Sequence, residues 1–157
     1  MRRIDTLLNE YAESHQNATN KKVHWVCVPV IFFTIYGMIR TIPVLEAMQD
    51  FSSDISWASV LLLLSLLYYC FLSLPLSIGF LFWSMIVFVG NEFLYMWLGS
   101  QGLLIFSLVV FALAWVGQFI GHGIEGKKPS FFKDVQFLLI GPAWLMSFIY
   151  KRLDIAY

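Results

Sequence analysis

Long runs of apolar residues limit what this chain can fold into. Four of them cover about residues 23–39, 57–74, 76–98 and 103–122, and each is close to the ~20 residues that a helix needs to cross a bilayer. Charged residues make up only 13% of the chain, against about 25% in a typical soluble domain. The sequence therefore predicts one integral membrane domain over residues 1–157, an all-α helical bundle with four spans.

Two weaker segments flank these runs. Residues 1–14 are predicted to form an amphipathic helix, which lies on the membrane surface or packs on the protein's own core. Residues 135–150 form a shorter apolar stretch that Gly141 and Pro142 interrupt. For this stretch a kinked fifth span, a re-entrant segment and an interfacial helix all remain open.

Local signals refine the element boundaries. Residues 14–22 are a polar connector, in which Thr19 or Asn20 is expected to cap the following helix. Pro29 lies inside the first run, where a membrane helix tolerates proline and can kink beside a cavity. Pro75 separates the second and third runs.

The basic residues predict the orientation, because cytoplasmic loops carry an excess of Lys and Arg. Four of them precede the first span and three follow the fourth, so four spans bring both groups to one side. The residues are Arg2, Arg3, Lys21 and Lys22, and then Lys127, Lys128 and Lys133. We therefore expect this end to face the cytoplasm, in a bacterial inner membrane or an endoplasmic reticulum membrane. No basic stripe is long enough to indicate nucleic acid.

The chain has three histidines, and this topology brings all of them to the cytoplasmic boundary. His15 lies in the connector, His24 in the first turn of the first span and His122 at the end of the fourth. Histidine is the commonest metal ligand near neutral pH. The helix N-terminus disfavours protonation of His24 and leaves its imidazole free to bind a cation. The spacing therefore indicates a metal site formed by the three histidines.

Neighbouring polar residues extend this hypothesis. Gln118, His122 and Glu125 share one helix face at i, i+4 and i+7. Asn20 is one turn before His24, where it could orient the imidazole ring. We therefore place Asn20 and Gln118 in supporting positions around the metal.

Other interpretations remain open for these polar residues. The histidines could instead be interfacial polar groups bonded to main-chain carbonyls. Lys127 is a membrane anchor or a group that holds an anionic headgroup or carboxylate. Glu92 lies inside the third span, towards the opposite end of the bilayer. We expect it to be protonated and bonded to a Ser or Tyr of a neighbouring span.

Two stretches carry a family resemblance. YAESHQNATNKKVHWVCVP is similar to a signature Y-x-x-x-H-x-N-x-x-N-x-x-x-H…VP, and QFIGHGIEGKKPS to a signature Q-F-x-G-H-x-x-E-x-x-x-P-[AS]. Together they resemble the membrane 2-hydroxy fatty acid dioxygenases, Fe(II)-dependent enzymes of fatty-acid α-oxidation first placed in phytosphingosine breakdown. The resemblance covers nearly the whole chain. It implies that His15, His24 and His122 hold the iron and that Glu125 occupies the motif's acidic position.

The expected function follows from this resemblance. A 2-hydroxy acid can chelate a metal through its carboxylate and hydroxyl, and three imidazoles leave open positions for this chelate and for O2. We therefore expect a dioxygenase that shortens 2-hydroxy fatty acids by one carbon, in contact with membrane lipids. Glu125 and Lys127 are its candidate catalytic residues. The alternatives are a zinc-dependent membrane lipid hydrolase and a non-enzymatic lipid-binding or assembly protein. The oligomeric state is not predicted.

Overall fold

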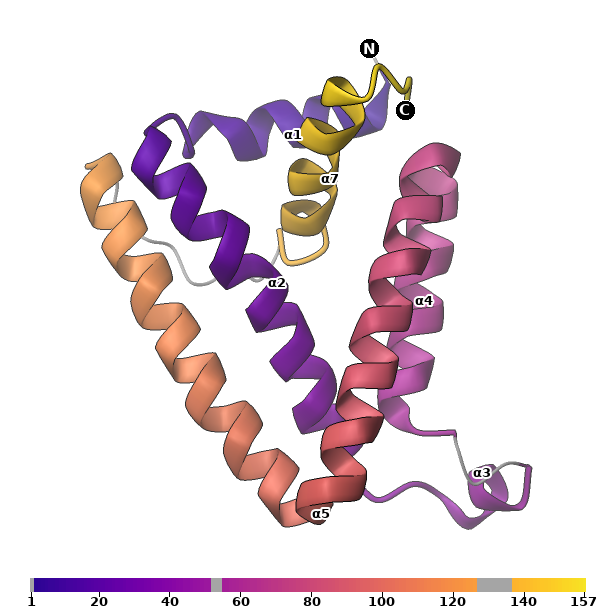
Figure 1. The fold of residues 1–157 in the computed structure, drawn as a ribbon. Helices are drawn as coiled ribbons and strands as arrows, with labels where there is room; N and C mark the ends of the chain where they lie inside the picture. Colours follow the sequence, from indigo (N-terminus) through magenta and orange to yellow (C-terminus); the bar gives the residue numbers. More distant parts are fainter. Residues whose placement is uncertain (1, 52–54, 127–136) are drawn as a thin grey trace.

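The computed structural model describes residues 2–51, 55–126 and 137–157, which contain helices and no strand. Figure 1 shows α2 (Ala18–Arg40) running between the two arms of α5 (Leu74–Glu125). The helix α4 (Trp57–Leu72) lies beside the first arm, and the short helix α3 (Glu46–Phe51) lies in the connection before it. The all-α prediction is confirmed.

One glycine divides α5. Gly99 has φ 68° and ψ 178°, a conformation that is essentially restricted to glycine. The chain therefore turns back at this point, and Figure 1 shows the two arms forming a V. This division agrees with the predicted runs 76–98 and 103–122.

Two of the helices, α2 and α5, are long and apolar enough to cross a membrane by length and composition, and α4 is a shorter apolar helix of 16 residues. Large apolar side chains on the outer faces are exposed, with Phe71 at 91% and Trp97 at 76%. Such exposure is unfavourable in water and is typical of helices in contact with lipid. These features indicate association with a membrane.

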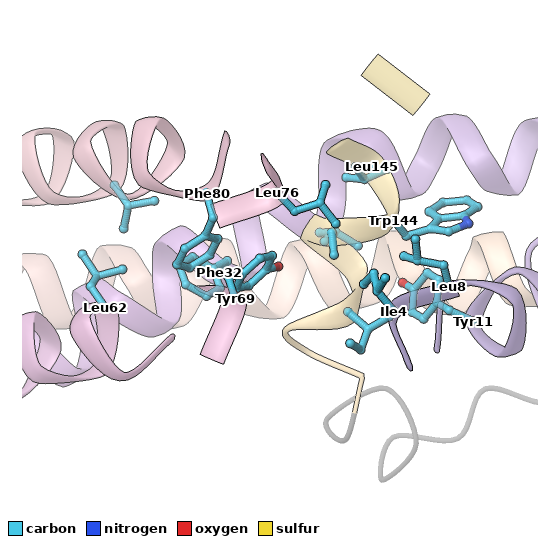
Figure 2. Close-up of a cluster of buried hydrophobic side chains, with 14 of the residues drawn as sticks. Ile4, Leu8, Tyr11, Phe32, Leu62, Tyr69, Leu76, Phe80, Trp144 and Leu145 are labelled. Carbon is cyan, nitrogen blue, oxygen red and sulfur yellow. The ribbon is translucent and has the colours of Figure 1, made fainter. Parts of the chain in front are cut away.

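The N-terminal amphipathic helix packs on the protein's own core. In α1 (Arg3–Glu13) the buried residues are Ile4, Leu8 and Tyr11. They join the buried core cluster to which Trp144 of α7 (Ile140–Arg152) also belongs, as Figure 2 shows. The apolar face of α1 is therefore covered by protein, which is the second of the two predicted alternatives.

The start of the first predicted span changes. Asn17, and not Thr19 or Asn20, caps α2, since its side chain accepts hydrogen bonds from the main-chain N–H groups of both residues. The helix thus begins at Ala18, and His24 lies in its second turn instead of its first. The helix dipole therefore acts less strongly on His24 than predicted, because its effect falls off within the first turn.

The last apolar stretch forms a helix without a central kink. Gly141 and Pro142 lie in the first turn of α7, where proline is tolerated because its missing N–H would have no partner there. With 13 residues, α7 is about 20 Å long, shorter than a hydrocarbon core of about 30 Å. Its dimensions suit an interfacial or re-entrant helix better than a fifth span.

Candidate metal centre

The three histidines meet at one end of the bundle. His15 lies in the turn between α1 and α2, His24 in α2 and His122 in the last turn of α5. All three are buried, and one ligand atom from each lies within 4.8 Å of the other two. Residues more than a hundred positions apart thus form the cluster that the topology predicts.

Main-chain carbonyls fix the orientation of two of these rings. The Nδ1 of His15 lies 2.6 Å from the carbonyl oxygen of Tyr11, and the Nδ1 of His24 lies 2.9 Å from that of Asn20. A carbonyl oxygen only accepts hydrogen bonds, so each Nδ1 carries the proton. Both neutral rings therefore have an unprotonated Nε2.

These two Nε2 atoms lie 2.9 Å apart. Two lone pairs facing each other at this distance repel, unless one ring takes up a second proton or a cation binds between the rings. The third imidazole, that of His122, has its ring centre 5.2 Å from both of the others. The donor set therefore fits a metal that prefers imidazole ligands, such as iron or zinc.

Aromatic side chains hold His15 from the other side. The Tyr11 ring stacks on the imidazole with ring centres 4.2 Å apart and an interplanar angle of 11°. Trp144 packs against both rings. Its ring centre lies 5.3 Å from that of Tyr11 and 5.4 Å from that of His15. The sequence analysis did not predict that Tyr11 and Trp144 contact His15. The two carbonyl contacts could have been predicted from spacing, because Tyr11 precedes His15 by four residues and Asn20 precedes His24 by four residues.

Glu125 contacts the connector that carries His15. Its carboxylate accepts hydrogen bonds from the main-chain N–H groups of Gln16 at 2.8 Å and Asn17 at 2.9 Å. It also accepts one from the side-chain amide of Asn20 at 3.0 Å. The last residue of α5 thus binds the N-terminus of α2, where a negative charge is favourable. Glu125 is not part of the histidine group.

Asn20 supports the cluster in a different way from the one we expected. Its main-chain carbonyl orients His24, while its side chain reaches Glu125. The close approach of α2 and α5 makes this contact possible. A Cβ on Gly121 would overlap Asn20 Oδ1, and one on Gly117 would lie 2.7 Å from Cys27 Sγ.

The remaining predicted residues have different positions. Gln118 is buried and lines a cavity together with His24. Lys127 lies outside the described residues.

Glu92 forms a bidentate ion pair with Arg40, with N–O distances of 2.6 and 3.0 Å, at the opposite end of α2 from the histidines. The predicted protonated state with a Ser or Tyr partner is therefore wrong, because a guanidinium from the end of α2 reaches the carboxylate.

Comparisons with known proteins relate the chain to one family. The family described as "2-hydroxy-palmitic acid dioxygenase Mpo1-like" matches residues 1–153. The chain is 29% identical over 149 residues to the 2-hydroxy-palmitic acid dioxygenase MPO1 of Saccharomyces cerevisiae, a match that covers 92% of this chain and 78% of the yeast protein. No solved structure matches the chain.

Proposed function

Because the chain belongs to the Mpo1-like family of 2-hydroxy-palmitic acid dioxygenases, we propose that it is a membrane dioxygenase that shortens 2-hydroxy fatty acids by one carbon. The observation that carries this proposal is the pair of facing Nε2 atoms of His15 and His24, with His122 beside them. Such a donor set suits Fe(II), and three imidazoles leave open positions for other ligands.

The proposed reaction needs no external reductant. One O2 and one 2-hydroxy acid give CO2, water and the carboxylic acid that is one carbon shorter. The C1–C2 bond breaks, C1 becomes CO2, C2 becomes the new carboxyl carbon, and O2 takes up the four electrons. Bound iron would supply O2 activation and a chelating position for the hydroxyl and the carboxylate.

The protein's own residues would set the geometry of this chemistry. Tyr11 and Asn20 hold the proton of His15 and His24 on Nδ1, so both Nε2 atoms point into the site. Glu125 would act by fixing the connector against α2, and we propose it as a positioning residue. Burial of the histidines limits water around the reacting groups.

We further propose that α2, α4 and both arms of α5 cross the membrane, with the histidines at the cytoplasmic face. Each α5 arm has roughly the length of one span. Arg2, Arg3, Lys21 and Lys22 all belong to the histidine end, which supports this orientation. The acyl tail would then lie among apolar helices and the carboxylate would meet the cluster at the boundary.

The test is a product assay with 2-hydroxypalmitic acid, under air and under argon, on protein loaded with Fe(II). We expect pentadecanoic acid and CO2 only under air, and little reaction with palmitic acid. The same three histidines could hold a catalytic zinc. A hydrolysis product from membrane lipid that forms without O2 would therefore replace the dioxygenase by a zinc lipid hydrolase. Absence of any stoichiometric metal would instead favour a lipid-binding protein.

A further inference from the structure

A small cavity adjoins the histidine cluster. His24 and Gln118 line one part of it, and the apolar side chains of Val28, Ile31 and Trp115 line another. Its free space is about 30 Å³, more than the ~10–15 Å³ that a single water needs. The cavity can therefore admit a small polar head, but it has no room for a long acyl tail.

Gln118 is a polar residue that lines this cavity. Its side chain is 5% exposed and lies one helical turn before His122 on α5. Its carboxamide makes no hydrogen bond to any residue that the structure describes. Buried carboxamides nearly always have partners, so one that faces a cavity indicates a ligand or a water.

We propose that the Gln118 carboxamide binds the oxygen atoms of the substrate head, an inference that rests on the proposed function. A 2-hydroxy carboxylate offers a hydroxyl donor next to a carboxylate acceptor. A carboxamide offers an acceptor oxygen next to an NH2 donor, so the two groups are complementary. The apolar walls formed by Val28, Ile31 and Trp115 strengthen these bonds, because they keep the local dielectric low.

This contact gives Gln118 a role in specificity. A plain fatty acid lacks the hydroxyl and would leave the Gln118 oxygen without its donor inside the cavity. Sites built to bind a hydroxyl discriminate strongly against analogues that lack it, for this reason. Gln118 thus favours 2-hydroxy acids over fatty acids of equal chain length.

The test measures binding to Fe(II)-loaded protein under argon, where no turnover occurs. Displacement of a fluorescent fatty acid gives the Kd for 2-hydroxypalmitic acid and for palmitic acid. The variant is Gln118→Leu. The matched control is Gln101→Leu, because Gln101 is an exposed glutamine of the same helix. Iron content is determined for each protein.

We expect Gln118→Leu to bind 2-hydroxypalmitic acid roughly tenfold or more weakly, with palmitic acid affinity and iron content unchanged. Gln118→Glu should lose at least as much, since a carboxylate repels the substrate carboxylate. Unchanged preference for the hydroxy acid in Gln118→Leu would show that the carboxamide only holds a water and would overturn the inference. Equal weakening for both acids, with loss of iron, would also overturn it. A wild-type protein that binds iron but does not distinguish the two acids would refute the proposed substrate itself.

Discussion

His15 and His24 present their Nε2 atoms to each other at 2.9 Å, while both Nδ1 atoms are directed to main-chain carbonyl oxygens. This relationship determines the tautomer of each ring and brings two lone pairs face to face, an arrangement that a bound cation or a second proton would relieve. It is therefore stronger support for a metal centre than the proximity of three histidines alone.

Glu125 should control the position of the connector that carries His15. In Glu125→Ala, the N–H groups of Gln16 and Asn17 lose their acceptor, and the turn before α2 loosens. We expect metal affinity to fall by about tenfold to a hundredfold, measured by competition with a chelator. Amide exchange at Gln16 and Asn17 should also become faster. Glu10→Ala, at an exposed position of α1, is the control. Equal metal affinity in both variants would rule out the positioning role.

The contact between α2 and α5 depends on a glycine. In Gly121→Ala, the new Cβ would overlap Asn20 Oδ1 and lie 3.3 Å from Val23 Cγ1. We expect destabilisation of about 1–3 kcal/mol together with weaker metal binding. In Gly123→Ala, two residues along the same helix, the new Cβ meets nothing within 4 Å. This control should be stabilised by about 0.5–1 kcal/mol, because alanine favours the helix. Thermal unfolding in detergent measures the stability of both variants. Equal melting temperatures for Gly121→Ala and Gly123→Ala would contradict the close packing of α2 and α5.

The ion pair of Arg40 and Glu92 should affect the stability of the fold and not metal binding by the histidines. The side chains are 15% and 24% exposed, and Arg40 also lies 4.2 Å from the centre of the Tyr95 ring. Either Arg40→Met or Glu92→Leu leaves one partly buried charge without its partner, and we expect a loss of about 1–3 kcal/mol. The double variant should recover much of this loss. Chemical unfolding and metal content provide the measurements. A change in metal content in any of these variants would show that the pair acts on the site.

The proposed topology predicts that the two ends of α2 lie on opposite sides of the membrane. Single cysteines replace Asn9, near the histidines, and Ile42, just after α2, in a background without Cys27 and Cys70. Both positions are exposed. A membrane-impermeant thiol reagent should label Asn9→Cys only from the cytoplasmic side and Ile42→Cys only from the other side. Labelling of both from one side would contradict the proposed crossing of α2.

The sequence predicted most of the helices, because apolar runs and helix-breaking residues are local signals. Pro75, which separates the second and third predicted runs, lies in the first turn of α5 for this reason. The cap of α2 was misplaced by two or three residues, since several neighbouring residues of the connector have side chains that can cap a helix. The position of α1 could not be decided, because an amphipathic face does not identify what covers it.

The histidine cluster could be predicted from topology, but its supporting contacts could not. Glu125 meets Gln16 and Asn17 across more than a hundred residues, and helical periodicity relates only residues of the same helix. The partner of Glu92 was missed for the same reason, since Arg40 comes from another helix. Tertiary contacts of this kind depend on the distance between helices, which the glycines of α5 set here.

The most direct test of the metal centre is the metal content of protein purified under argon. We predict one iron ion per chain in the wild type and in Asn9→Ala, an exposed position of α1. The variants His15→Ala, His24→Ala and His122→Ala should each lose most of the iron while they remain folded in the membrane, because each loses one imidazole of the buried group. A wild type without bound metal, or full iron occupancy in all three histidine variants, would contradict the account.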